Sequence, residues 1–470
     1  MVALFTPCCT SYSSSSKFIE ISTLGENLYM STTVNTNLKS QPTPELFSWE
    51  NNWYPVTFTQ DFFEDKPYSF SLYDQPLILF RNSAGKLICL KNLCPHRAAK
   101  LSDGQLINGR VECLYHGWQF GTDGECLHIP QLDKSAKIPK QACIKSFPTQ
   151  ESQGIIWVWL GDKAEKNETS IPVVKEVEKT GLFTVDTVID LPYDQDFLVE
   201  NFLDPAHVPI SHDRTELGMK REFAAPLEME VLSSSIDGFS GRYKKSNGSQ
   251  LSSWTDVEFI APYLVKYKLG NESTNFFGGF ALYAIPNGRG RCRVLVRRYG
   301  NFFSRLFRLT PRWLEHLRQN KLLEEDLPFI VEQQAHIEKT GKNLQEIYLP
   351  LKTSDTFVIE HRKWLDKYGQ NLPYYQGYTS FKRSPINPLE DIPLDRLDRH
   401  TKNCSSCDRA YRRIQLFGQI AIALAIILAA LAIVTEDKTI TIVFVSMSLL
   451  SIGKFTILQR LKTSFENTNV

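Results

Sequence analysis

The sequence predicts an α+β protein of several domains, and three observations carry this prediction. Short apolar and β-branched runs separated by turns fill residues 46–165. A helix-like run, several strand-like runs and two further helical stretches fill residues 166–370, and two long apolar runs lie near the C-terminus. A length of 470 residues allows two or three domains, and 42% hydrophobic residues are ample for their cores. A formal net charge of +1 argues against a polyanionic partner, so we expect no nucleic-acid role.

Residues 1–45 are rich in Ser and Thr and carry no long apolar run, so they do not resemble a secretory signal. A transit peptide is an alternative, but Arg is absent from the segment while Glu20 and Glu26 are present. We expect a disordered or targeting tail, or an extension of a chain that begins at Met30.

Residues 46–165 are expected to form a small antiparallel β domain. Predicted strands cover residues 76–80, 86–90 and 154–160, and turn residues such as those at 82–85 separate them. Residues 166–370 combine strand-like runs with helices, an order that suits an antiparallel sheet held by a long helix.

The β domain contains two Cys/His pairs. Cys94 and His96 form the first pair, and Cys113 and His116 follow after sixteen intervening residues. Two thiolates and two imidazoles at this spacing are typical of a Rieske 2Fe–2S cluster, in which the cysteines hold one iron and the histidines the other. A zinc centre is the alternative, although zinc motifs usually pair Cys with Cys and His with His. We predict these four residues as cluster ligands in a redox protein.

A second group of ligand-type residues has the pattern N-x-x-D-x-x-H-x-x-x-x-H, from Asn201 through Asp204 and His207 to His212. Two imidazoles near a carboxylate on a helix or helical turn can face one metal ion, as non-heme Fe(II) oxygenases require. The alternative is a helix end with surface histidines.

The two motifs together resemble the Rieske non-heme iron oxygenases, and among them the group of pheophorbide a oxygenase, chlorophyllide a oxygenase and the translocon-associated Rieske proteins. The resemblance implies an all-β Rieske domain and a helix-grip catalytic domain. It implies that His207 and His212 bind a mononuclear Fe(II), that Asp204 bridges His207 to a cluster histidine of a neighbouring subunit, and that Asn201 lies near the iron. It also implies a ferredoxin-type reductant, O2 as co-substrate and a homotrimer.

A third iron ligand is expected farther along the chain, in the charged, helical run that contains Glu324, Glu325 and Asp326. Its context resembles that of the family's acidic ligand. We predict Asp326 as the ligand and Glu325 as the next candidate, while a solvated helix face is the ordinary alternative for such residues.

Residues 371–413 are expected to form a linker that contains Cys404 and Cys407, a C-x-x-C pair. Such a pair can be redox-active, because the second thiol can resolve an oxidised first one, and its position resembles the C-terminal C-x-x-C of the pheophorbide a oxygenase group. His316, His336 and His361 have no partner at a ligand-like spacing, so we interpret them as surface or packing residues.

Residues 414–458 are predicted to form a transmembrane hairpin. The apolar runs 416–434 and 439–458 flank a polar break and are long enough to span a bilayer, whereas a buried core hairpin is the alternative. Basic residues precede and follow the hairpin, which places the body on the cytoplasmic or stromal side of a cyanobacterial membrane or a plastid envelope or thylakoid. Residues 459–470 are expected to be a tail.

The expected function follows from the resemblance. It is a membrane-anchored oxygenase that uses electrons from ferredoxin to oxygenate a lipophilic ring compound, a chlorophyll-derived tetrapyrrole of the pheophorbide a or chlorophyllide a type. Two alternatives stay open: a membrane Rieske monooxygenase acting on another lipophilic ring, and a redox-sensing or electron-transfer component in which the mononuclear site is inactive.

Overall fold

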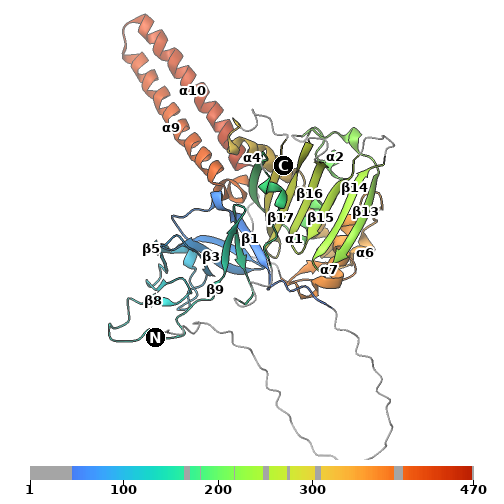
Figure 1. The fold of residues 1–470 in the computed structure, drawn as a ribbon. Coiled ribbons are helices and arrows are strands. Elements are labelled where there is room, and N and C mark those ends of the chain that lie inside the picture. Colours follow the sequence, from blue (N-terminus) through green and yellow to red (C-terminus); the bar gives the residue numbers. More distant parts are fainter. Residues whose placement is uncertain are drawn as a thin grey trace, which may run out of the picture.

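The computed structural model describes residues 45–162, 170–179, 181–215, 218–246, 253–271, 276–301, 309–385 and 395–467. Of the predicted N-terminal tail, residues 1–45, only Glu45 is among the described residues. Figure 1 shows a β-rich lobe, a large sheet with its helices, and a helical hairpin that projects from the body. The predicted α+β architecture is confirmed. The division into domains stays a prediction, although two of its edges fall inside helices described below.

The N-terminal lobe is all β. It contains sheets with the orders β1-β11-β10, β2-β3-β4-β9 and β5-β6-β7-β8. The strands are β1 (Trp53–Phe58), β2 (Tyr68–Leu72), β3 (Gln75–Arg81), β4 (Leu87–Lys91), β5 (Gln105–Ile107), β6 (Arg110–Glu112), β7 (Gln119–Phe120), β8 (Cys126–His128), β9 (Ser146–Phe147), β10 (Thr149–Ser152) and β11 (Ile155–Trp159).

The core of this lobe is divided in two. Every residue of β11 is buried, and Trp157 packs edge-on against Tyr283 of the catalytic sheet with ring centroids 5.8 Å apart. The lobe and the catalytic domain therefore share one apolar core. A smaller core lies at the far tip of the lobe and includes Cys94 and Cys113.

The catalytic domain is built on a seven-stranded antiparallel sheet of order β12-β18-β17-β16-β15-β14-β13. Its strands are β12 (Phe183–Leu191), β13 (Leu227–Ser235), β14 (Gly238–Lys245), β15 (Thr255–Ile260), β16 (Leu264–Asn271), β17 (Phe276–Gly288) and β18 (Arg291–Gly300).

Strand β12 forms one edge of this sheet. Asp186 pairs with Arg297 and Asp190 with Arg293 across the β12–β18 ladder. Both carboxylates bind their arginines through two oxygens, with N–O distances of 2.8 Å for Asp186 and of 2.6 and 2.8 Å for Asp190. Such bidentate pairs are strong and directional, so they hold the edge strand in register.

Helices cover the sheet and connect it to the hairpin. α1 packs across β16, β17 and β18, and α7 packs against β13. The helices and two short strands are α1 (Gln195–Phe202), α2 (Val208–Ser211), α4 (Arg312–Glu325), α5 (Leu327–Thr340), α6 (Leu344–Ile347), α7 (Thr356–Tyr368), β19 (Tyr375–Gln376), β20 (Phe381–Lys382), α8 (Arg396–Arg399), α9 (Ser405–Val434) and α10 (Lys438–Glu466).

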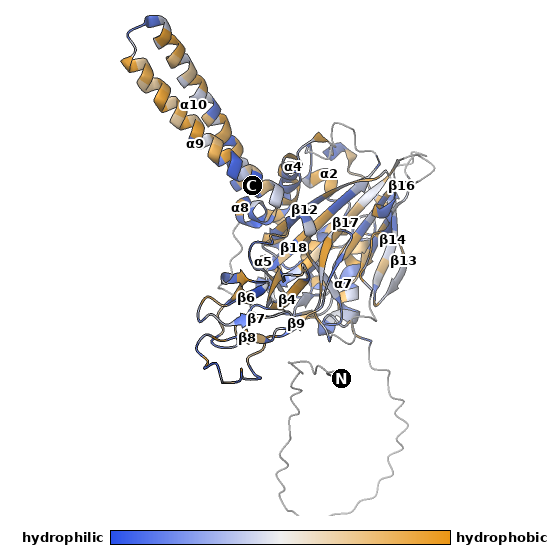
Figure 2. Cartoon of the chain, turned by 60° about the vertical axis from the view of Figure 1, so that its left-hand side comes forward, coloured by the Kyte–Doolittle hydropathy of each residue, from blue (hydrophilic) through white to orange (hydrophobic). Residues whose placement is uncertain are grey.

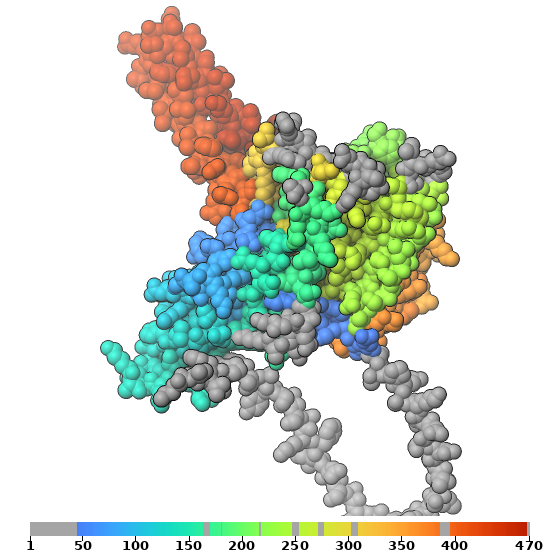
Figure 3. All heavy atoms as spheres, in the orientation of Figure 1, coloured from blue at the N-terminus to red at the C-terminus, as the bar shows by residue number. Residues whose placement is uncertain are grey.

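The C-terminal hairpin consists of α9 and α10, which stand clear of the body as an apolar rod (Figures 2 and 3). Both helices are long and apolar enough to cross a membrane, and only 28% and 11% of their apolar windows are buried. This low burial argues against the core-hairpin alternative. Ser448 donates a 2.9 Å hydrogen bond to the Ala425 carbonyl and ties the helices together.

The hairpin differs from its predicted limits at both ends. α9 begins at Ser405, inside the predicted linker, and α10 continues to Glu466, inside the predicted tail. The extra turns are polar, so the apolar pattern alone does not reveal them. Phe465 is fully buried against the body, which explains why the helix does not fray there.

Candidate functional site: two groups of metal-ligand residues

The first group lies on two loops at the tip of the β lobe. Cys94 lies on the loop after β4, and its N–H donates to the Ala99 carbonyl at 2.9 Å. Cys113 lies between β6 and β7, and its N–H donates to the Trp118 carbonyl at 2.9 Å. Gly117 closes the second loop with a φ of 72°, a left-handed conformation that glycine adopts without strain.

The four predicted cluster residues lie on these two loops as a cysteine pair and a histidine pair. Cys94 and Cys113 are 2% and 1% exposed, and burial raises the pKa of the Cys94 thiol to about 11. The rings of His96 and His116 lie 4.4 Å apart, and Trp118 stacks on His96 at 4.7 Å. The buried Nδ1 of His96 has no hydrogen-bond partner among the described residues. Two buried sulfurs beside an imidazole with an unused nitrogen fit a 2Fe–2S cluster.

The second group joins a loop to a helix junction. Asp204 follows α1, and its Oδ1 accepts from the N–H groups of Ala206 and His207 at 2.8 and 3.3 Å, which closes the turn into α2. Asp326 stands between α4 and α5. Pro328 in the first turn of α5 lacks an N–H and cannot continue α4, so the sequence itself produces the junction that presents Asp326.

Three side chains converge at this junction. The Nε2 atoms of His207 and His212 lie 3.5 and 3.3 Å from Oδ2 of Asp326. One ligand atom of each residue lies within 4.8 Å of the others. The His207 side chain stays 21% exposed while that of His212 is 5% exposed. Two imidazoles and one carboxylate with an accessible side fit a non-heme Fe(II) site that keeps positions open.

Other polar groups hold these three side chains in place. Oε2 of Glu325 lies 2.9 Å from Nδ1 of His212, and Oδ2 of Asp204 lies 3.4 Å from Nδ1 of His207. Asn201 donates to Oδ2 of Asp326 at 3.2 Å. Carboxylates behind metal-ligating histidines fix the tautomer and the ring orientation. Glu325, our second choice as ligand, therefore supports His212 instead of converging with Asp326.

Buried ion pairs fix the helix that leads into this site. Arg362 of α7 donates to Asp196 at 2.7 Å and to Glu200 at 2.5 Å, and both carboxylates belong to α1. The Arg362 side chain is fully buried. Because a buried arginine must keep its partners, this contact sets the position of α1 and hence of the Asn201 amide at its end.

The electrostatic environment of His207, His212 and Asp326 favours a bound cation. Burial opposes the charged form of His207, but the carboxylates of Asp204 and Asp326 raise the pKa of His207 to about 10. Burial acts in the same way on Asp326, yet the two imidazoles hold the pKa of its carboxyl well below the usual range. Both shifts express one fact: the local charge is negative until a proton or a metal ion enters.

A cavity of about 530 Å³ lies elsewhere, among residues 59–60, 183–186 and the start of α4. None of the second group lines it, so we do not assign it to the substrate.

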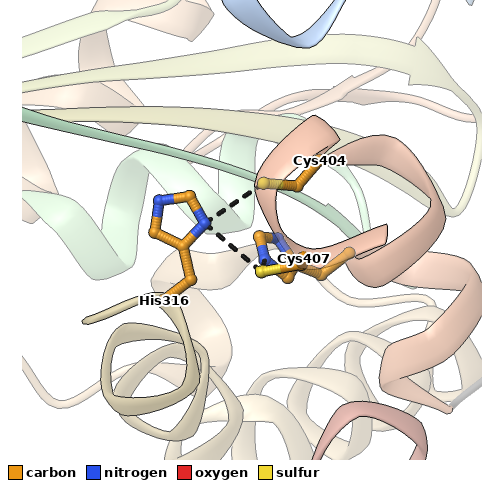
Figure 4. Close-up of side chains that lie close together, drawn as sticks. His316, Cys404 and Cys407 are labelled. Atoms are coloured by element: carbon orange, nitrogen blue, oxygen red, sulfur yellow. Dashed lines mark hydrogen bonds between the residues drawn. The ribbon is translucent and has the colours of Figure 1, made fainter. Parts of the chain in front are cut away.

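The C-x-x-C pair is placed differently from the prediction. Cys404 and Cys407 are fully buried, and both sulfurs contact Nδ1 of His316, at 3.3 and 3.6 Å (Figure 4). His316, which we interpret from the sequence as a surface or packing residue, is buried and contacts both sulfurs, and these partners lie far away in the sequence. The spacing H-x-x-x-C-x-x-C, which begins at His400, is the one local signal that could have indicated the group.

The two remaining histidines match their interpretation. His361 packs edge-on against Phe259 with centroids 5.1 Å apart, and His336 is exposed.

Comparison with known proteins agrees with this geometry. A family model for the Rieske [2Fe-2S] domain matches residues 52–148, and a model for pheophorbide a oxygenase matches residues 259–343. The solved structure of dicamba monooxygenase bound to dicamba aligns with a TM-score of 0.57 at 23% identity, over 68% of this chain and 97% of that one. At this identity the alignment shows the fold.

Two curated relatives from Arabidopsis thaliana extend over most of the chain. "Protein TIC 55, chloroplastic" is 36% identical over 90% of this chain and 84% of its own length. "Pheophorbide a oxygenase, chloroplastic" is 31% identical over 86% of this chain and 80% of its own length. The Rieske domain and the oxygenase relatives together imply a 2Fe–2S cluster and a mononuclear iron. The chain belongs to the Rieske non-heme iron oxygenases, in the group that contains pheophorbide a oxygenase and TIC 55.

Proposed function

We propose that this chain is a membrane-anchored oxygenase that takes electrons from a ferredoxin-type donor and uses O2 to oxygenate a lipophilic ring compound. The observation that carries this proposal is the convergence of His207, His212 and Asp326 on one point in a chain that also carries a Rieske motif. An electron carrier needs only the Rieske motif. A second, accessible site with two imidazoles and one carboxylate is what O2 chemistry requires.

The site residues have distinct roles in this proposal. Cys94, His96, Cys113 and His116 hold the cluster, and His207, His212 and Asp326 hold the iron. When bound, the cluster supplies single electrons and the iron supplies coordination positions for O2. The chain's own groups do the rest: Glu325 keeps a proton on Nδ1 of His212 and leaves its Nε2 lone pair free, the Asp204 carboxylate lies 3.4 Å from Nδ1 of His207, and Asn201 orients the Asp326 carboxylate.

We propose a homotrimer in which the cluster of one copy serves the iron of the next. Figures 1 and 2 both draw the tip of the β lobe at the opposite end of the body from α2, so electron transfer between sites of one copy would have to cross the whole molecule. Leu114 and Tyr115, between two cluster ligands, are each 60% exposed and offer an apolar contact. The Asp204 side chain is 27% exposed and can face a neighbouring cluster histidine.

We propose a chlorophyll-derived tetrapyrrole of the pheophorbide a or chlorophyllide a type as the substrate. The family-model match and the relative named pheophorbide a oxygenase support this class. The hairpin supports it as well, because a substrate that partitions into lipid is delivered along a membrane. Another lipophilic ring compound is the alternative within the same chemistry.

We propose that the hairpin spans a plastid or cyanobacterial membrane with the catalytic body on the stromal or cytoplasmic side. Arg409, Arg412 and Arg413 precede the apolar part of α9, and Arg460 and Lys462 follow that of α10. Both ends therefore carry positive charge beside the body, as the positive-inside rule expects for a two-span anchor.

The test is oxygen uptake by the full-length, iron-replete protein in mild detergent with reduced ferredoxin. Pheophorbide a, chlorophyllide a and a blank are compared, and products are identified by mass spectrometry. We expect uptake coupled to an oxygenated pigment. A cluster that reduces normally while uptake stays at the blank level with every pigment would overturn the substrate class. Failure of the second site to retain Fe(II) after iron loading would instead favour a redox-sensing component.

A further inference from the structure

Four buried side chains, separate from the cluster residues and from the iron-site residues, form a further candidate metal site. His316 belongs to α4, His400 follows α8, and Cys404 and Cys407 lie at the start of α9. All four residues have an exposed fraction of 0%. One ligand atom of each lies within 4.8 Å of the other three. The oxygenase chemistry proposed above uses none of them.

The edge of the catalytic sheet sets the tautomer of both histidines. Among the described strands β12 pairs with β18 alone, so carbonyls of alternate residues face outward. Nε2 of His316 lies 2.8 Å from the Asp186 carbonyl, and Nδ1 of His400 lies 2.5 Å from the Val188 carbonyl. A carbonyl only accepts, so these nitrogens carry the protons. The remaining ring nitrogens, Nδ1 of His316 and Nε2 of His400, keep their lone pairs.

Both lone pairs face the sulfurs. Nδ1 of His316 lies 3.3 Å from Sγ of Cys404 and 3.6 Å from Sγ of Cys407, and Nε2 of His400 lies 3.2 Å from Sγ of Cys407. A tetrahedral zinc centre with Zn–S of about 2.3 Å and Zn–N of about 2.0 to 2.1 Å has N–S edges of roughly 3.6 Å. The four donors therefore already have nearly the separation that a tetrahedral centre needs.

The charge balance favours a divalent ion. Two thiolates in a dry interior would be costly alone, whereas two thiolates, two neutral imidazoles and Zn²⁺ form a neutral unit. Histidines that donate their second N–H to backbone carbonyls are also the usual arrangement around bound metal. With four protein donors the centre is closed and leaves no position for a substrate, which is typical of structural zinc.

We propose that His316, His400, Cys404 and Cys407 bind one structural Zn²⁺. Binding exchanges two S–H bonds for two S–Zn bonds and releases two protons to solvent, with no change of oxidation state. The ion would join the base of the membrane hairpin to α4 and, through the histidines, to the sheet edge. α4 continues to Glu325 and Asp326, so the same helix would connect the anchor to the iron site, with ten positions, or roughly 15 Å, between His316 and Asp326.

The competing interpretation is the redox pair expected for Cys404 and Cys407. A disulfide between them would remove both sulfur donors, so the two states exclude one another in any one molecule. The structure records both cysteines as free thiols. In a redox pair the imidazoles would serve only to activate a thiol, whereas the zinc interpretation makes each lone pair that faces the sulfurs a ligand.

The first experiment is elemental analysis of the full-length protein, purified in detergent under reducing conditions without chelators. We expect one zinc per chain beside the irons. The double variant Cys404→Ser/Cys407→Ser should lose the zinc and keep the Rieske spectrum. The control variant Cys292→Ala removes another fully buried cysteine of the same domain and should keep the zinc. His207→Ala should also keep it, which excludes zinc that has merely entered the iron site.

X-ray absorption at the zinc edge of the unmodified protein makes the test independent of how the variants fold. We expect two sulfur and two nitrogen neighbours, at about 2.3 and about 2.0 to 2.1 Å. Substoichiometric zinc, or a zinc shell without sulfur, would overturn the proposal. Recovery of the Cys404–Cys407 peptide as a disulfide from the freshly purified protein would overturn it in favour of the redox pair.

Discussion

The two ligand groups of the catalytic domain share one helix and differ in almost everything else. Asp326, at the end of α4, belongs to a group with carboxylates and a partly exposed histidine. His316, in the second turn of α4, belongs to a group of imidazoles and thiols that is completely buried. A metal site with three protein ligands and open positions suits catalysis, and a closed site with four protein donors suits a structural role. Accessibility and donor number, more than the presence of histidines, distinguish the two uses.

The hydrogen-bonding partners of the outer ring nitrogens also differ between the two sites. His207 and His212 have carboxylates at their outer nitrogens, whereas His316 and His400 have backbone carbonyls. A carboxylate increases the basicity of the imidazole and can be changed by mutation without moving the backbone. A carbonyl belongs to the sheet itself. The open site can therefore be tuned through side chains, and the closed site is tied to the fold.

Removing the acid from the open site should have the largest effect on activity. Asp326→Ala deletes a ligand and leaves the two imidazoles of His207 and His212 without their shared carboxylate. We expect turnover to fall by more than about 100-fold, beyond the effect of losing a supporting group. Iron analysis should show the loss of one iron, while the Rieske spectrum and the zinc content stay unchanged. Retention of all iron would show that Asp326 is not a ligand.

A substitution at Glu324, which lies on α4 between His316 and Asp326, should reduce the thermal stability of the protein more than its oxygenase activity. Glu324 of α4 is 2% exposed and pairs with Arg396 and Arg399, with N–O distances of 2.9 and 3.2 Å. Glu324→Gln removes the carboxylate charge that pairs with both buried guanidinium groups, which costs about 3 to 5 kcal/mol. Thermal unfolding in detergent should show a clearly lower midpoint. The exposed Glu332→Gln on α5 is the matched control and should behave like the unchanged protein.

Weakening the support of one ligand should have a smaller effect. Glu325→Gln keeps the size of the side chain but replaces the carboxylate 2.9 Å from Nδ1 of His212 by a neutral amide. We expect iron affinity to fall by about 10- to 100-fold, as is usual when such a partner is lost. Titration of the iron-free protein with Fe(II) under anaerobic conditions measures this. An unchanged affinity would mean that Glu325 does not orient His212.

A chelator should affect the closed group least. The His207 side chain is 21% exposed, whereas every zinc donor has an exposed fraction of 0%. We expect a water-soluble chelator to remove the mononuclear iron within a time that leaves the zinc in place. Metal analysis after gel filtration checks this order. Zinc that leaves first would contradict the closed geometry.

The sequence predicts best what lies close together in the chain. The Rieske ligands lie on two neighbouring loops, and His207 and His212 share one turn, so local spacing identifies them. Asp326 is separated from Asn201 by 125 residues, and only its acidic context in a helical run indicated it.

The thiol group could not be predicted in this way. His316 is separated from Cys404 by 88 residues, and the two meet because β12 offers its free edge to both histidines. Sheet-edge geometry has no signature in the sequence. The polar ends of α9 and α10 were missed for a related reason, since tertiary contacts at the body, such as the burial of Phe465, maintain the helices there.

The most direct test is a single turnover with isotopically labelled O2. The cluster of the full-length protein is reduced in the presence of pheophorbide a, excess reductant is removed, and labelled O2 is admitted. We predict reoxidation of the cluster together with labelled oxygen in the pigment, and neither event at a comparable rate in His207→Ala. Reoxidation that leaves the pigment unlabelled, equally fast with and without His207, would contradict oxygenation of this pigment at the His207/His212/Asp326 site.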